Sequence, residues 1–140
     1  MKPIPRALAV PLLVSAAAFG QDPAAVTSAR EIAKQGLRAY DAGNYQEAAD
    51  KLSVAYQAVK VPTLALYTAR ALVEVGKLVE ASEIYLQATR LKASGSDAAA
   101  QEQAQKQAAQ ERFELLSRIP TLVVVIEGAE PNEVAVAVDG

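Results

Sequence analysis

Carboxylates are the side chains of this sequence that could carry acid–base chemistry, because it contains no histidine and no cysteine. That composition excludes nucleophilic triads of the Ser-His-Asp or Cys-His type and removes the most common metal ligands. Paired carboxylates can act as acid and base in glycoside hydrolysis, so we considered Glu31 with Asp41 and Glu80 with Glu83. Glu80 and Glu83 lie three positions apart and would share an exposed helix face. Without aromatic sugar platforms or a buried environment, we interpret all four as surface charges.

Patterns that bind phosphate are also missing from the sequence, which contains no Gly-x-Gly loop. We therefore predict no catalytic residue, no cofactor and no metal site, and we expect a protein that is not an enzyme. The length of 140 residues, with 51% hydrophobic and 21% charged residues, fits one compact domain or a short repeat array better than a disordered chain.

The first 20 residues have the features of a secretory signal peptide. Lys2 and Arg6 give a basic start, an apolar run follows over residues 7–19, and small residues precede a cleavage site near Gly20. The run is shorter than the roughly 20 apolar residues that span a bilayer, so we expect no transmembrane segment after cleavage. The sequence thus predicts a periplasmic or secreted protein, with an uncleaved anchor or a buried first helix as the alternative.

The charge balance bears on the kind of partner. Removing residues 1–20 takes two positive charges from a formal net charge of -2, which leaves -4. Binding to a phosphate backbone would need a basic stripe with interleaved aromatic residues, and the sequence has none. We therefore expect a protein or peptide as partner, with no nucleic acid and no small-molecule cofactor.

Apolar residues recur at helical spacing between Val26 and Leu91, and the breaks between them divide this region into four helices. Ser28 with Glu31 forms a capping-box pattern that would start the first helix. Gly43 would end it, and Pro62 suits the opening of the third helix because proline fits a first helical turn.

The second and fourth predicted helices repeat one another. Equivalent positions are 33 residues apart: Gly43 and Gly76, Tyr45 and Leu78, Ala48 and Ala81, Leu52 and Tyr85, Ala55 and Ala88. The glycine allows a left-handed turn between two helices, and the alanines let neighbouring helices approach closely. An internal repeat of two helices with this period indicates stacked helical hairpins.

The pattern Gly43-x-Tyr45-x-x-Ala48-x-x-x-Leu52-x-x-Ala55 resembles the core motif of tetratricopeptide (TPR) repeats. The resemblance implies a mainly α fold with two antiparallel helical hairpins over residues 27–93. A related helical-hairpin repeat is the alternative, because the spacing is one residue shorter than the usual ~34.

A long helix over residues 97–118 is expected to cap the repeats, because terminal repeats need a polar outer face. We predict that one narrow apolar strip of this helix packs on the fourth helix: Ala100, Ala104, Ala108, Ala109, Phe113, Leu116 and Ile119. The other faces are rich in glutamine, so a coiled-coil, self-assembling envelope protein is the alternative.

Residues 120–140 change character from helical to strand-forming. A run of β-branched and aliphatic residues, a turn around Gly128 and an alternating segment from Val134 to Val138 predict a β-hairpin. This segment resembles the opening of the small β-sandwich modules called PEGA domains. TPR repeats followed by such a module resemble exported proteins of delta-class bacteria, of the myxobacterial type.

The TPR resemblance implies a concave face lined by the first helix of each hairpin. The residues that it places there, as a candidate partner-binding groove, are Arg30, Leu37, Tyr40, Thr63, Leu66 and Arg70. Arginine can hold a carboxylate through paired donors, and apolar surface can bury a side chain. We therefore expect a non-enzymatic exported scaffold for protein–protein interaction in the cell envelope. The further alternative is an accessory region of a larger enzyme.

Overall fold

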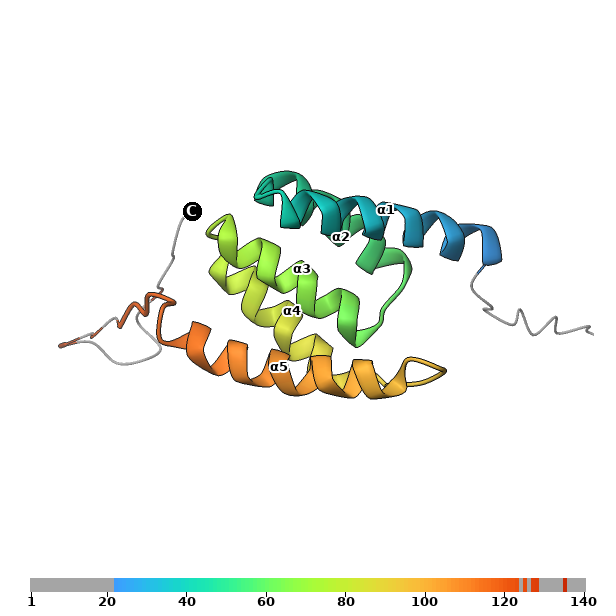
Figure 1. Cartoon of the computed structure of the whole chain (residues 1–140). Helices are drawn as coiled ribbons and strands as arrows, with labels where there is room; N and C mark the ends of the chain where they lie inside the picture. The colour runs from blue at the N-terminus through green and yellow to red at the C-terminus, as the bar shows by residue number, and fades with distance from the viewer. Residues whose placement is uncertain (1–21, 124, 126, 129–134, 136–140) are drawn as a thin grey trace, which may run out of the picture.

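A computed structural model describes residues 22–123, 125, 127–128 and 135, and this part of the chain is mainly helical (Figure 1). The helices are α1 (Pro23–Asp41), α2 (Tyr45–Ala58), α3 (Pro62–Glu74), α4 (Leu78–Arg90) and α5 (Ala98–Leu116). The prediction of a mainly α fold is confirmed. None of these helices is both long and apolar enough to cross a membrane.

The predicted β-hairpin is not visible in the residues after α5 that the structure describes, which have no regular secondary structure. The remaining residues of the 120–140 segment lie outside the described residues. The predicted signal peptide, residues 1–20, lies outside them as well.

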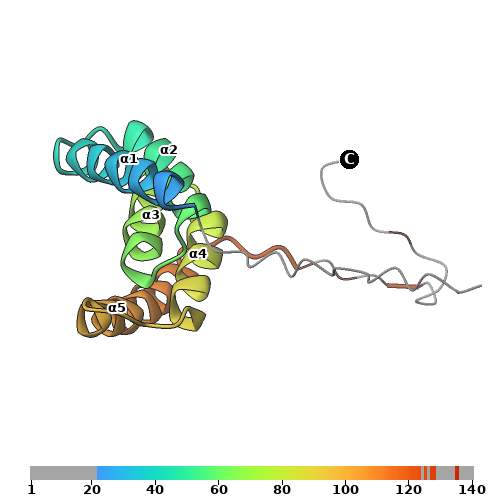
Figure 2. The same ribbon diagram turned by 90° about the vertical axis from the view of Figure 1, so that its right-hand side faces the viewer.

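The five helices form two layers. Figure 2 shows α1, α3 and α5 on one side and α2 and α4 on the other, with α1 and α5 flanking α3. Helix α1 packs against α2, α3 packs against α4, and α2 packs against α3, so two hairpins stack directly on each other. Helix α5 packs against both α3 and α4 and covers one end of the stack.

The turns inside the two hairpins have the same conformation. Gly43 and Gly76 have φ angles of 77° and 82°, in the left-handed region that favours glycine. Corresponding backbone hydrogen bonds close both turns: Gly43 N to Tyr40 O and Gly76 N to Val73 O, both 3.0 Å; Asn44 N to Ala39 O, 2.8 Å; Lys77 N to Leu72 O, 2.9 Å. The 33-residue repeat of the sequence is therefore also a repeat of backbone geometry.

Small residues set the distance between the packed helices. Ala48 and Ala81, which are equivalent in the two hairpins, are both 0% exposed. Gly36 of α1 lies so close to α2 that a Cβ atom at this position would be 2.8 Å from Cγ of Leu52 and 3.2 Å from its backbone nitrogen. Only a glycine fits there without displacing one of the helices.

Two helix boundaries and faces differ from the sequence prediction. Helix α1 begins at Pro23 rather than at Ser28, because Asp22 accepts a hydrogen bond from the amide of Ala24 at 3.0 Å and proline occupies the first turn. Glu31, the predicted capping partner of Ser28, instead pairs with Lys34 at 2.7 Å inside the helix.

The predicted packing face of α5 is wrong in part. Ala104 and Ala108 are buried as expected, but Phe113 and Leu116 are 79% and 45% exposed. The buried face is shifted around the helix and includes Gln101 and Leu115. Polar side chains hold this face to α4: Gln105 donates to the carbonyls of Ala88, Thr89 and Leu91, and Arg112 donates to Ser82 O at 3.1 Å. An apolar pattern alone could not identify it.

The fit at Gly36 gives a test of the helix packing. Glycine to alanine normally favours a helix by ~1 kcal/mol, but overpacking typically costs ~1 to 3 kcal/mol. We expect Gly36→Ala to lower the free energy of unfolding by about 1 kcal/mol net, measured by urea denaturation. Gln57→Ala, an exposed change on α2, should stay within about 0.5 kcal/mol of the wild type. A more stable Gly36→Ala variant would contradict the close approach.

Candidate functional site

Two hollows lie on the side where α1 and α5 flank α3. The first, which we call the apolar hollow, has a volume of about 560 Å³ and lies between α1, the start of α3 and the α4–α5 connection. Among its lining residues are Leu37, Val61, Leu64 and Tyr67. Its size falls in the range of ligand sites in proteins, and its lining combines apolar surface with a few polar groups.

The second hollow, which we call the charged hollow, has a volume of about 320 Å³. It lies at the other end of α3, among the last turns of α1, α3 and α5. Its lining includes Tyr40, Arg70, Glu74, Tyr85, Glu111 and Glu114.

Tyr67 connects the two hollows. Its ring lines the apolar hollow and makes an edge contact with the ring of Tyr40, with centroids 6.3 Å apart. The guanidinium of Arg70 lies 5.2 Å from the centroid of the Tyr67 ring, within the range of a cation–π interaction. Since Tyr40 and Arg70 both line the charged hollow, the two hollows form one continuous concave surface.

The structure distributes the predicted groove residues between these hollows. Arg30, Leu37 and Thr63 line the apolar hollow, and Tyr40 and Arg70 line the charged hollow. The remaining candidate, Leu66, is 2% exposed and belongs to the hydrophobic core.

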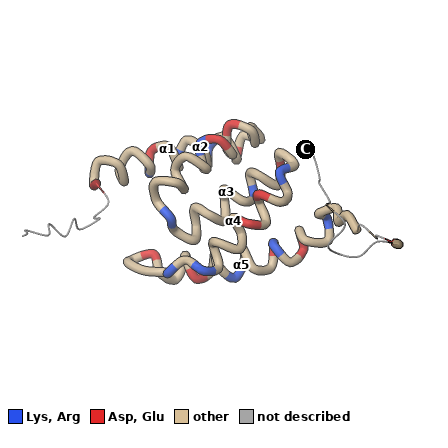
Figure 3. The backbone as a smooth tube through the Cα atoms, turned by 180° about the vertical axis from the view of Figure 1, so that it is seen from behind, with Lys and Arg blue, Asp and Glu red and all other residues tan. Residues whose placement is uncertain are grey.

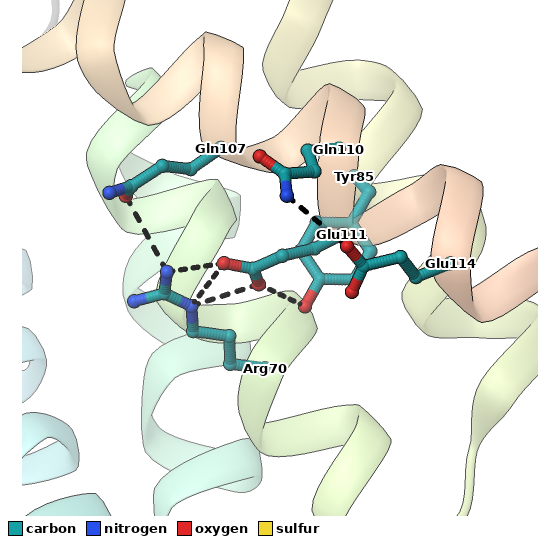
Figure 4. A network of polar contacts seen from close by, with 6 residues as sticks. All are labelled: Arg70, Tyr85, Gln107, Gln110, Glu111 and Glu114. Atoms are coloured by element: carbon teal, nitrogen blue, oxygen red, sulfur yellow. Dashed lines mark hydrogen bonds and ion pairs between the residues drawn. The ribbon is translucent and has the colours of Figure 1, made fainter.

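Arg70 already has a carboxylate partner within the chain (Figure 4). Its Nε donates to both carboxylate oxygens of Glu111, at 3.1 and 3.0 Å, and its Nη2 also contacts Glu111. The hydroxyl of Tyr85 donates to Glu111 at 2.7 Å. The arginine that sequence reasoning assigned to a partner thus joins α3 to α5.

Burial alone would raise the pKa of Glu111, but the hydrogen bonds from Arg70 and Tyr85 outweigh it, so the pKa lies below its usual value. For Tyr85, burial and the hydrogen bond to Glu111 both raise the pKa of the hydroxyl. The network therefore holds a carboxylate anion next to a neutral phenol and a cationic guanidinium at neutral pH.

Sequence reasoning missed Glu111 and Tyr85 as members of this network. They lie 41 and 15 residues from Arg70 along the chain, so no local spacing connects them. Only the packing of α5 on α3 and α4 brings the three side chains together.

The carboxylate pairs considered for catalysis have surface surroundings. Glu31 pairs with Lys34, and Glu80 with Lys77 at 3.8 Å, and all four side chains are more than half exposed. Within residues 22–123 and the few described beyond them, no group of three or more acidic side chains could hold a metal ion.

A scan against protein-family models finds none that matches this chain. Searches of curated proteins and of solved structures return no match either.

The Glu111 network gives a pH-dependent prediction. Because the pKa of Glu111 is lowered in the folded state, its stabilising effect is present above the unfolded-state pKa of about 4.3 and is lost as pH falls through the lower folded-state pKa. We expect Glu111→Gln to cost about 1 kcal/mol of unfolding free energy at pH 7, and we expect the difference from the wild type to shrink below about pH 4.

The matched control is Glu102→Gln, an exposed change on the same helix. Urea denaturation of the three proteins across pH measures the effect. Equal stability of the two variants at pH 7 would show that Glu111 does not hold α5 in place.

Proposed function

We propose that this protein is a non-enzymatic TPR-type scaffold that binds a segment of another protein on its concave face. The observation that carries the proposal is the continuous surface formed by the apolar and charged hollows along α3. Stacked helical hairpins with matching turns, at Gly43 and Gly76, support it, because such stacks create extended concave binding surfaces.

The lining of the apolar hollow suits a polypeptide. Leu37 and Leu64 offer surface to bury an apolar side chain, while Thr63 and Arg30 offer polar groups at its edge. Binding sites for proteins commonly combine a buried apolar anchor with a polar rim. The hollow is open on one side, so a chain could enter and leave it along α3.

The place of action is proposed from the sequence. Residues 1–20 have the features of a signal peptide, which supports export to the periplasm or the medium. A PEGA-like module over residues 120–140 would then attach the scaffold to another component of the cell envelope. The TPR resemblance supports this arrangement through the repeated motif that begins at Gly43.

A random-peptide display selection tests the proposal. We expect the wild type to enrich peptides, and we expect Leu37→Asp to lose them by at least about tenfold in affinity, because it places a charge in the apolar hollow. Val54→Asp is the matched control, since Val54 is an exposed apolar residue of α2, in the other layer. Circular dichroism checks that both variants are folded.

Failure to enrich any peptide with the wild type would contradict the proposal. Peptides that bind Leu37→Asp as well as they bind the wild type would also contradict it, because the binding surface would then lie elsewhere.

Self-assembly through α5 is a second candidate, and one observation favours it. Ala109, Phe113 and Leu116 lie at steps of four and three residues on α5 and are all exposed. A stripe with this spacing suits the contact between two helices. If α5 mediates assembly, the wild type should be a dimer or larger in light scattering, and Phe113→Ser with Leu116→Ser should make it monomeric. A monomeric wild type at ~100 μM would exclude this candidate.

A further inference from the structure

The two ends of the concave surface carry opposite charge, which bears on the chemistry of the segment that fits there. At the apolar hollow, the charged lining residues are Arg30, Lys34 and Asp97, so cations are in excess. Arg30 is exposed, and the side chain of Lys34 is 60% exposed although its ammonium pairs with Glu31. Both cations are therefore accessible to a bound chain.

At the charged hollow, carboxylates are in excess. The acidic lining residues are Glu74, Glu111 and Glu114, and the basic ones are Arg70 and Arg118. Arg70 is engaged with Glu111, so this pair contributes little net charge. Glu74 and Glu114 are exposed and belong to two different helices, α3 and α5. They face the hollow from two sides.

The direction of the helices adds to this charge difference. Figure 1 shows that α1, α3 and α5 run in the same direction, with their first turns at one end of the molecule and their last turns at the other. The first turn of α3, at Thr63, lines the apolar hollow, and its last turn, at Glu74, lines the charged hollow. Helix dipoles are positive at the first turn and negative at the last, so they have the same sign as the side chains at each end.

Charges elsewhere on the molecule are mixed. Figure 3 shows acidic and basic positions interspersed along the helices rather than sorted by sign. The separation of sign along the concave surface is therefore a property of this surface and not of the whole molecule.

The length of the surface sets the length of the segment. Thr63 and Glu74 are 11 residues apart on α3, which at 1.5 Å per residue separates them by about 16 Å along the helix axis. An extended chain advances ~3.3 Å per residue and would cross this distance in about five residues.

From these observations, and resting on the proposed binding function, we infer that the concave surface selects an extended segment with opposite charges at its two ends. An acidic residue lies at Arg30 and Lys34, apolar side chains enter the hollow at Leu37 and Tyr67, and a basic residue lies at Glu74 and Glu114. A segment with a single sign of charge meets attraction at one end and repulsion at the other.

Three fluorescein-labelled peptides test the inference by fluorescence anisotropy with the full chain: EELLSKK, EELLSEE and KKLLSKK. We expect EELLSKK to bind about 3- to 10-fold more tightly than either of the others, since exposed ion pairs are individually weak. The preference should disappear near 1 M salt, where the screening length is about 3 Å.

Charge-swap variants make the test specific for each end. In the variant Arg30→Glu with Lys34→Glu, KKLLSKK should become the preferred peptide, whereas in Glu74→Lys with Glu114→Lys the preferred peptide should be EELLSEE. All four positions are exposed, so the fold should be retained, which circular dichroism checks.

Equal binding of the three peptides by the wild type, or a preference that the charge swaps leave unchanged, would overturn the inference. The proposed function fails separately, when the display selection gives no peptide that depends on Leu37. Selected peptides that depend on Leu37 but carry no charge pattern would preserve the function and overturn only the inference.

Discussion

The close approach of neighbouring helices at small side chains is the constraint on which the rest of this structure depends. Where Gly36 of α1 faces Leu52 of α2, no room remains for even a methyl group. The equivalent position of the second hairpin, 33 residues later, is Ala69, which is fully buried. With the helices this close, the two hairpins nest, and their first helices are left side by side as a layer that can form a concave surface.

Helix α5 is held by a different kind of contact. It has few large apolar side chains on its buried face, and much of its attachment comes from Gln105, Glu111 and Arg112, which bond to α3 and α4. Such bonds are directional, so they fix the rotation of the helix about its own axis more closely than apolar packing would. The position of α5 in turn defines one wall of the charged hollow.

The sequence was sufficient to predict the features that depend on local pattern. The turns at Gly43 and Gly76, the start of α3 at Pro62 and the burial of the repeated alanines all follow from residue type and spacing. The face of α5 was predicted wrongly because hydrophobicity ranks Phe113 above Gln101, whereas in the folded protein Gln101 is buried and bonds to the backbone of Ser94. The partner of Arg70 was also beyond sequence reasoning, since it depends on contacts between distant helices.

The connection between α4 and α5 contributes Ser94, Gly95, Ser96 and Asp97 to the wall of the apolar hollow, yet it contains none of the alanines that hold the hairpins together. Residues that shape recognition and residues that maintain the fold are therefore carried by different parts of the chain. Insertions or exchanges in this connection can change which side chains are admitted at little cost to folding, because surface loops tolerate variation. Descendants of one stable framework could acquire new partners by this route.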